Sequence, residues 1–490
     1  MNTRHIICLK NGIVRNPLVR LDEPACFDLE SDEHIAIIGP NGSGKSLLVD
    51  MITGRHPLCE GTLSYDFYPS ASHTAYKNIK YITFRDTYGT ADANYYYQQR
   101  WNAQEQGEVP EAIELIGKEN IENETARNLL EEFGITPMLH KKIVTLSSGE
   151  LRKLQIVKSL LPFPRVLIID NPFIGLDAEA RQLLERTFNK LSHWNLLQII
   201  LILTSAKDIP GFITHIVPIN HKKTGRKVAK KEYLPPITND KTKSYNPKLP
   251  TQIAQCPHPF HLQPLAPGNN TIVELHHIKI TYDRRIILNL PEWIVRQGEK
   301  WALCGENGSG KSTLLSLICA DNPQSYACDI SLFGRKRGTG ESIWDIKRRI
   351  GYVSPEMHRA YQKNLPTIDI VASGLHDTIG LYKQLQPEQK DICRWWMEIF
   401  GIAHLADKMF LQMSSGEQRM ALLARAFVKD PELLVLDEPF HGLDPTNSMR
   451  ARHIIDAFCQ REGKTLIMVT HYDTELPQAI GHRLQLSKNT

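Results

Sequence analysis

Short, uninterrupted runs of mainly aliphatic residues recur along the chain, several of them directly before a glycine or an aspartate. They lie at residues 34–38, 166–169, 196–203, 433–436 and 465–469. None alternates apolar with polar positions, as a strand with one solvated face would. Continuous apolar runs of this length are typical of strands buried on both faces of a parallel sheet. The pattern therefore predicts α/β domains.

The chain carries one series of short motifs twice, in the same order. The first motif recurs 266 residues later and the other three recur 267 residues later. The paired segments are residues 39–46 and 305–312, 146–150 and 413–417, 169–172 and 436–439, and 175–177 and 442–444. A repeat of this length indicates a duplicated domain and not a solenoid of small units.

We expect a first domain over residues 1–218, a linker over residues 219–270 and a second domain over residues 271–490. The linker is the chain's one compositional break, with six Lys and Arg residues between 222 and 231 and eight prolines between 235 and 267. Each proline removes a backbone donor and clashes with the preceding turn, which excludes a continuous helix. A semi-extended linker is predicted. The basic cluster is either an RNA- or lipid-contacting patch or a solvated linker, and we favour the linker.

The chain is not strongly basic, because its 58 Lys and Arg residues are nearly balanced by 54 Asp and Glu residues. No apolar stretch reaches the roughly 18–20 residues of a membrane span, and the first residues lack the apolar core of a signal peptide. We expect a cytoplasmic protein, either free or peripheral on the inner face of the membrane. The nine cysteines are dispersed without a CxxC pair, which predicts reduced thiols.

The two glycine-rich segments match the phosphate-loop pattern GxxxxGK[ST]. In this pattern, backbone N–H groups and the positive end of the following helix face phosphate oxygens. We expect Lys45 and Lys311 to reach the β- and γ-phosphates of ATP, and Ser46 and Ser312 to coordinate Mg²⁺. The residues expected to bind nucleotide are Gly39, Asn41, Gly42, Ser43, Gly44, Lys45 and Ser46 in the first half and Gly305, Asn307, Gly308, Ser309, Gly310, Lys311, Ser312 and Thr313 in the second.

An aspartate closes one aliphatic run in each half, and the residue after it differs between the halves. Asp170 and Asp437 fit the second carboxylate of a Mg²⁺ shell. Glu438 can act as a general base towards water, whereas the amide of Asn171 has no basic oxygen.

The last strand shows the same difference. His471 can hydrogen-bond a γ-phosphate, and its counterpart Ser205 offers only a hydroxyl. Two losses in one half predict one hydrolytic site and one degenerate site.

With the phosphate loops, the Ser-Ser-Gly-Glu elements complete a series that resembles the ATP-binding-cassette (ABC) ATPases. These elements stand where that family carries its signature motif, usually LSGGQ. The resemblance implies two P-loop domains, each with a mainly parallel sheet, an antiparallel β subdomain and a helical subdomain. It also implies head-to-tail packing around ATP and Mg²⁺. The competent site then combines Lys311, Ser312, Asp437, Glu438 and His471 with Ser148 and Gly149, and the degenerate site combines Lys45, Ser46, Asp170 and Asn171 with Ser415 and Gly416.

The resemblance also has implications for two further positions. Tyr282 stands where the family stacks adenine, and the first half has no aromatic residue around positions 13–16. Family members that drive membrane transporters usually carry a glutamine after the next strand. Here Pro355 and Phe84 occupy that position.

At subfamily level, residues 332–353 resemble the tandem ABC ATPases known as ModF or photorepair proteins, which are associated by name with molybdenum transport. The expected function is ATP hydrolysis as the ATPase subunit of a transporter, with molybdate as the substrate the name suggests and with separate permease subunits. The alternative is a soluble ABC ATPase that acts on ribosomes or nucleic acid. The prolines of the linker argue against the long charged helix that joins the halves of translation-acting relatives.

Overall fold

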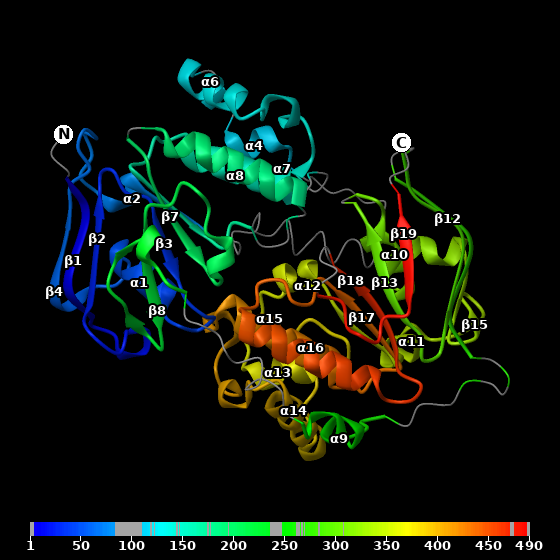
Figure 1. The fold of residues 1–490 in the computed structure, drawn as a ribbon. Coiled ribbons are helices and arrows are strands. Elements are labelled where there is room, and N and C mark those ends of the chain that lie inside the picture. The colour runs from blue at the N-terminus through cyan, green and yellow to red at the C-terminus, as the bar shows by residue number, and fades with distance from the viewer. Residues whose placement is uncertain are drawn as a thin grey trace. The chain divides into compact units, whose positions relative to one another are not determined.

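The computed structural model describes residues 4–83, 110–117, 120–121, 123–143, 146, 148–173, 176, 178–194, 196–235, 247–260, 265, 268, 270–282, 285–306, 308–470 and 475–487. The described residues form two compact units, one from residues 4–235 and the other from residues 247–487. Each unit is described by itself (Figure 1).

The first unit is built on a mainly parallel sheet. Its parallel strands lie in the order β8, β3, β7, β6, β5, and two short strands, β9 and β10, pair antiparallel with β8. Their bounds are β3 Ile35–Ile38, β5 Ile79–Ile82, β6 Val166–Asp170, β7 Gln198–Leu203, β8 His215–Asn220, β9 Lys223–Thr224 and β10 Val228–Ala229. The apolar runs of this half are therefore strands, as predicted.

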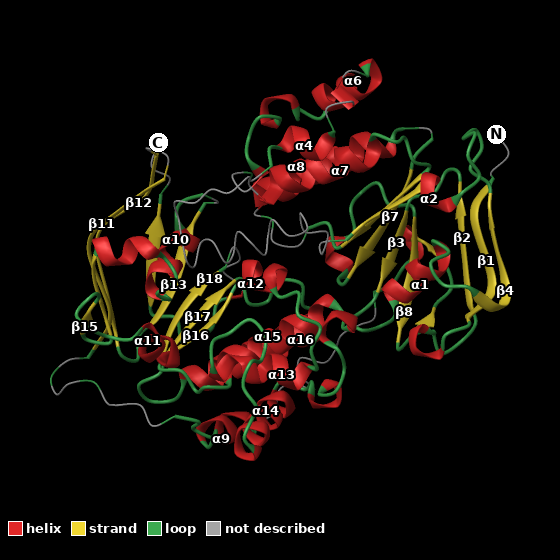
Figure 2. Ribbon diagram, turned by 180° about the vertical axis from the view of Figure 1, so that it is seen from behind, coloured by secondary structure: helices red, strands yellow, loops and turns green. Residues whose placement is uncertain are grey.

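Two layers cover this sheet. An antiparallel sheet of β2, β1 and β4 lies over one face, with helix α1 between the sheets, and further helices cover the other face (Figure 2). The bounds are β1 His5–Val14, β2 Ala25–Glu30, β4 Leu58–Tyr65, α1 Lys45–Ile52, α2 Ala75–Asn78, α4 Ala112–Ile116, α6 Glu124–Glu132, α7 Ser148–Leu160 and α8 Ala178–Ser192. Along β6, Val166 and Ile168 pack on the α1 side, whereas Leu167 and Ile169 pack under the helices. Both faces of the strand are buried in a hydrophobic core, which explains its unbroken apolar run.

The basic part of the expected linker is folded onto the first unit. Strands β9 and β10 extend the core sheet, and the ammonium of Lys227 lies 2.8 Å from the Glu33 carboxylate and also pairs with Asp28. Glu33 is almost fully buried. The segment is therefore held against the first unit through Lys227, while Lys222, Arg226 and Lys231 are exposed to solvent.

The second unit repeats the same plan. Its parallel sheet has the order β16, β17, β18, β13, β19, and an antiparallel sheet of β12, β11, β14 and β15 covers helix α10 (Figure 2). The strands are β11 Thr271–Tyr282, β12 Arg285–Arg296, β13 Lys300–Gly305, β14 Asp329–Leu332, β15 Arg335–Lys336, β16 Ile350–Val353, β17 Leu433–Asp437, β18 Thr465–Val469 and β19 His482–Leu486. The order matches β5, β6, β7, β3, β8 of the first unit, so the two halves share one topology.

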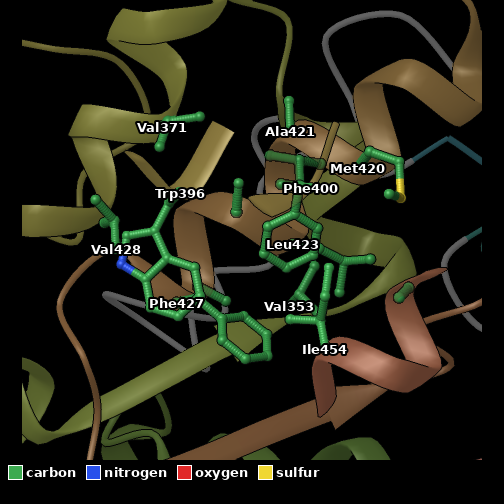
Figure 3. Packing of buried hydrophobic residues seen from close by; sticks show 14 of the residues in the cluster. Val353, Val371, Trp396, Phe400, Met420, Ala421, Leu423, Phe427, Val428 and Ile454 are labelled. Carbon is green, nitrogen blue, oxygen red and sulfur yellow. The ribbon is translucent and has the colours of Figure 1, made fainter. Parts of the chain in front are cut away.

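Helices pack under the other face of the second sheet around aromatic side chains. Trp396, Phe400 and Phe427 are almost fully buried, and the Phe427 ring centroid lies 5.3 Å from that of Trp396 and 5.4 Å from that of Phe400 (Figure 3). The helices of the second unit are α9 Leu249–Ala254, α10 Lys311–Ile318, α11 Ile343–Arg349, α12 Pro355–Ala360, α13 Thr367–Ala372, α14 Pro387–Ile399, α15 Ser415–Phe427 and α16 Pro445–Cys459. Of these, α10 and α11 pack on the side of the antiparallel sheet. Helix α15, which opens at the predicted signature element, thus forms part of the core.

The proline-rich part of the expected linker contains one short helix, α9, which starts with a proline in its first turn. Leu249 and Ile253 bury against the core of the second unit. After the helix, His258 Nδ1 lies 2.6 Å from Asp430 Oδ2, and Cys256 lies within the same cluster. The described part of the segment around α9 is therefore fixed to the second unit.

Asp430 anchors this segment through a buried ionic cluster. Its carboxylate, 3% exposed, accepts from both terminal nitrogens of Arg461 and lies 2.9 Å from the Lys464 ammonium. Burial alone raises the pKa of Asp430, but the hydrogen bonds and charges of Arg461 and Lys464 outweigh burial and hold it below its ordinary value. Two cations already neutralise this carboxylate, so the cluster is an ionic anchor and a poor metal site.

We expect Asp430→Asn to destabilise the second unit by about 3–5 kcal/mol at neutral pH, because it leaves buried cations without their counter-charge. A carboxyl group with a lowered folded-state pKa adds stability above its unfolded pKa and loses it as the pH falls through the folded value. The gap between wild type and variant should therefore shrink below about pH 4. Urea unfolding followed by tryptophan fluorescence at several pH values measures it.

The matched control is Asp345→Asn. Asp345 pairs with Arg348 at 3.4 Å, but both side chains are more than half exposed. Its loss should cost less than about 1 kcal/mol. Equal unfolding midpoints for the two variants would contradict the anchoring role of Asp430.

Candidate functional site

Each glycine-rich loop joins a central strand to a helix at the carboxyl edge of its sheet. The first runs from β3 into α1 and the second from β13 into α10. Lys45 Nζ donates to the backbone oxygens of Gly39 and Pro40 at 2.6 and 2.8 Å. Lys311 Nζ makes the same contacts with Gly305 and Glu306 at 2.7 and 2.8 Å. Both amines thus fold over their loop, where phosphate oxygens can replace the carbonyl acceptors.

The loop glycines are required by backbone shape and by crowding. Gly44 and Gly310, which cap α1 and α10, have φ of 102° and 91°, in the left-handed region that favours glycine. A Cβ on Gly310 would lie 2.8 Å from the Ile287 carbonyl oxygen. A Cβ on Gly39 or Gly305 would lie even closer to the carbonyl of the next strand, at 2.0 and 2.5 Å. No other residue fits these positions without moving the loop.

The other predicted loop residues lie in matching places. Gly42 and Gly308 have φ of 73° and 80°. The Ser43 and Ser309 side chains are buried under the loops. Ser46, Ser312 and Thr313 stand on the first helical turn, the two serines exposed, while Asn41 is half-buried and Asn307 lies outside the described residues. A lysine amine, a glycine-rich loop at a helix N-terminus and an exposed hydroxyl make a donor set that fits a magnesium-bound nucleotide phosphate.

The two acidic strand ends lie at the same edge of each sheet as the glycine-rich loop. In each sheet, one strand separates the strand that ends in aspartate from the strand that leads into the loop. Asp170 ends β6 and Asp437 ends β17. The Tyr81 hydroxyl lies 3.5 Å from Asp170 Oδ2. Burial raises the pKa of Asp437 well above its ordinary value, the charges of Glu356 and Glu438 raise it further, and Arg419 and Lys311 act in the opposite direction. A nearby divalent cation would favour the ionised carboxylate.

The residue after each aspartate has the same backbone in both halves. Asn171 and Glu438 have left-handed φ angles of 48° and 47°, and their N–H groups donate to Ile202 and Val469 of the neighbouring strand. The two side chains make different contacts. Asn171 Nδ2 donates to Asp170 Oδ1 at 2.8 Å, while Glu438 Oε2 lies 3.3 Å from His441 Nδ1. The amide binds its neighbouring aspartate, whereas the carboxylate offers an acceptor that can take a proton.

Both predicted signature elements open a helix. Ser414 caps α15 and forms a reciprocal capping box with Glu417, Ser415 begins the helix and Gly416 is buried. Ser148 and Gly149 are the first two residues of α7. A serine cap leaves the remaining N–H groups of the first turn as candidate anion ligands.

Sequence reasoning missed Arg419 of α15. This side chain is 1% exposed and donates to four backbone carbonyl groups. The acceptors are the oxygens of Ser354, Asp437, Glu438 and Pro439, at 2.6 to 3.3 Å. One signal existed in the sequence, because Arg152 stands 267 residues earlier and donates to the Pro172 oxygen at 2.8 Å.

Several predicted positions have no described side chain. His471 and Phe84 lie outside the described residues, and Tyr282 ends β11, paired with Arg285, with its side chain outside them. Pro355, at the position where transporter-driving relatives carry glutamine, opens α12 behind its Ser354 cap. Ser205, the counterpart of His471, accepts from the Lys207 N–H.

Within the described part of the chain, no helix combines the length and the hydrophobicity that a membrane crossing requires.

Known proteins match both halves of the chain. The family model described as ABC transporter matches residues 23–174 and 288–441. The chain is 35% identical over 463 residues to the ABC transporter ATP-binding protein ModF of Escherichia coli (strain K12), over 93% of this chain and 92% of that protein. It is 29% identical to the uncharacterized ABC transporter ATP-binding protein C323.04 of Schizosaccharomyces pombe, over 94% and 93% of the two chains. The predicted tandem architecture and the resemblance to ModF are confirmed.

Among solved structures, the model of ribosome-bound archaeal Pelota and ABCE1 matches with a TM-score of 0.55 and 18% identity, over 90% of this chain and 70% of that chain. This likeness concerns the fold alone.

We expect Gly310→Ala to remove ATP binding from the second loop, because the added Cβ would lie 2.8 Å from a backbone oxygen. Titration calorimetry should then show about one ATP per chain where the wild type binds two. The matched control is Gly298→Ala, whose φ of 84° is similar but whose Cβ would meet nothing within 4 Å. It should cost about 1–2 kcal/mol of stability for its backbone alone. Unchanged stoichiometry in Gly310→Ala would contradict the assignment of this loop.

Proposed function

The chain belongs to the ABC transporter ATPase family, and we propose that it binds two ATP molecules, hydrolyses one, and transmits the resulting closure to a partner protein. We take the expected domains, residues 1–218 and 271–490, as the two cassettes. The observation that carries the proposal is the pair of equal backbone turns at Asn171 and Glu438 with unequal side chains. The backbone at these two residues has the same φ and the same hydrogen bond to the neighbouring strand, so the difference we propose lies in side-chain chemistry.

In the second site, the reaction converts ATP and water to ADP and phosphate. Lys311 and the loop N–H groups hold the β- and γ-phosphates. Glu438 takes a proton from the attacking water, which is typically worth about 10²–10⁴ in rate. His471 hydrogen-bonds the γ-phosphate, and Tyr282 stacks on adenine. Mg²⁺, held by Ser312 and Asp437, would neutralise charge on the phosphates.

In the first site, the same loop holds ATP through Lys45, with Ser46 and Asp170 as the expected Mg²⁺ ligands. Asn171 donates its amide to Asp170 and has no basic oxygen of its own. Asp170, whose Oδ1 accepts that amide and which is the expected Mg²⁺ ligand, is not placed as a general base towards water. This site keeps ATP bound through many turnovers of the other. Its bound nucleotide then serves to hold the cassettes together.

Each site is completed by the signature helix of the other cassette, as in the family. Ser148 and Gly149 of α7 face the ATP held by Lys311, and Ser415 and Gly416 of α15 face the ATP held by Lys45. The N-terminal turn of each helix supplies N–H donors and a positive dipole end for the γ-phosphate. Hydrolysis at one site therefore loosens one of the two contacts.

The partner we propose is a membrane permease made of separate chains. The relative ModF is named as an ABC transporter ATP-binding protein, and molybdate is the substrate that our subfamily assignment suggests. Ribosome or nucleic-acid binding is the alternative, and the fold likeness to ribosome-bound ABCE1 does not favour it because the identity is only 18%.

We expect Glu438→Gln to abolish steady-state ATP hydrolysis while both sites still bind ATP, because the amide cannot accept the proton of water. Asn171→Ala is the matched control in the first site and should change the rate by less than about twofold, since a general base contributes at least 10² and none is lost there. Quenching the working enzyme and counting ADP and ATP on the protein tests the asymmetry. Equal turnover at both sites would contradict it.

We expect the Glu438→Gln chain, tagged and purified from gently solubilised cells with ATP, to carry membrane permease subunits, because a trapped closed state preserves the partner contact. The wild-type chain without nucleotide is the control. Recovery of ribosomal subunits instead would overturn the permease assignment and support the alternative.

A further inference from the structure

A histidine lies beside the carboxylate that we assign as general base. Glu438 follows the end of β17, and His441 lies three residues later in the turn that leads to α16. The backbone N–H of His441 donates to the Glu438 oxygen at 3.1 Å, which closes the turn. The imidazole Nδ1 lies 3.3 Å from Glu438 Oε2, and the two side chains are 16% and 17% exposed. The contact is local, largely shielded from water and set by the turn itself.

The turn is held rigidly on both sides of His441. Arg419 donates to the carbonyl oxygens of Asp437, Glu438 and Pro439 before it. After it, Leu443 donates to the Phe440 oxygen, and Asp444 caps α16 by accepting from Asn447. The imidazole therefore approaches the carboxylate from a fixed position.

The duplicated chain offers an internal comparison for this contact. The seven residues 438–444 read Glu-Pro-Phe-His-Gly-Leu-Asp, and their counterparts 171–177 read Asn-Pro-Phe-Ile-Gly-Leu-Asp. Five of the seven positions are identical. The two that differ are those whose side chains touch in the second half. The first half lacks both the carboxylate and the imidazole, although the other five residues of its turn are the same. The histidine therefore accompanies the proposed base and is not a requirement of the turn.

We propose that His441 is a positioning residue for Glu438, an inference that rests on the proposed function. Its Nδ1–H donates to the carboxylate and holds it in the rotamer that receives the proton of the attacking water. A glutamate side chain has three rotatable bonds, so several rotamers are open to Glu438. A donor 3.3 Å from Oε2 favours the rotamer in which the two side chains meet. His441 acts through Glu438 and does not contact ATP in this scheme.

The test compares three variants of the full chain. His441→Ile installs the residue of the first half and removes the donor. It should lower kcat about ten- to hundredfold, since misplacing a catalytic group has effects of this size, and it should leave the KM for ATP within about twofold. His441→Asn keeps an N–H donor near the place of Nδ1 and should recover most of the lost rate. A fold defect would not be repaired by this amide.

The third variant combines His441→Ile with Glu438→Gln. If the histidine acts only through the carboxylate, the double variant should be no slower than Glu438→Gln alone in a single-turnover assay with bound ATP. A further loss in the double variant, or equal losses in the Ile and Asn variants with a raised KM, would overturn the positioning role.

The remaining outcomes separate this inference from the proposed function. Unchanged kcat in His441→Ile, together with abolished turnover in Glu438→Gln, overturns the role of His441 and leaves the proposed function intact. Near-normal turnover in Glu438→Gln overturns both, because no base would remain for His441 to position.

Discussion

The chemistry of the second half depends on one buried guanidinium. Arg419 reaches from the signature helix to four backbone carbonyl groups, three of them in the turn that follows β17. Burial lowers the pKa of Arg419, and the nearby charges of Glu438 and Asp437 act in the opposite direction. That turn holds Glu438 at a φ of 47°, a conformation that costs about 1–3 kcal/mol and persists only where its surroundings over-determine it. The hydrogen bonds from Arg419 to Asp437, Glu438 and Pro439 supply that constraint, and they couple α15 to the proposed general base.

The same constraint explains how two equal scaffolds can carry unequal chemistry. The backbone turn is preserved at Asn171, with the same φ and the same hydrogen bond to the neighbouring strand. Asparagine tolerates the left-handed region better than glutamate does. The degenerate turn is therefore the less strained of the two, and the strained residue is kept where a carboxylate is needed. Strain maintained at a reactive group is typical of catalytic sites.

Local features such as strands and loops could be predicted from the sequence, whereas contacts between residues far apart along the chain could not. The aliphatic run at Ile35–Ile38 and the glycine spacing of each loop predict their structures directly, because sheet burial and loop shape act on consecutive residues. Lys227 was expected in solvent, yet it pairs with Glu33, 194 positions earlier. Arg419 was missed for the same reason, since its acceptors are backbone oxygens that no residue type marks. Only the repeat itself, through Arg152, could have revealed it.

The duplication also indicates which substitutions the turn tolerates. The five conserved positions of the turn serve its backbone: a proline, a phenylalanine, a glycine, a leucine and the aspartate that caps α16 in the second half. The two variable positions carry the side chains that meet in the second half, Glu438 and His441. A paired change there can remove or restore general-base chemistry at little cost in stability, because the hydrogen bonds that shape the turn are made by carbonyl groups. In the proposed function, the division between a scaffold of backbone contacts and a removable pair of side chains is therefore the property that would let one chain keep two ATP sites and assign hydrolysis to one.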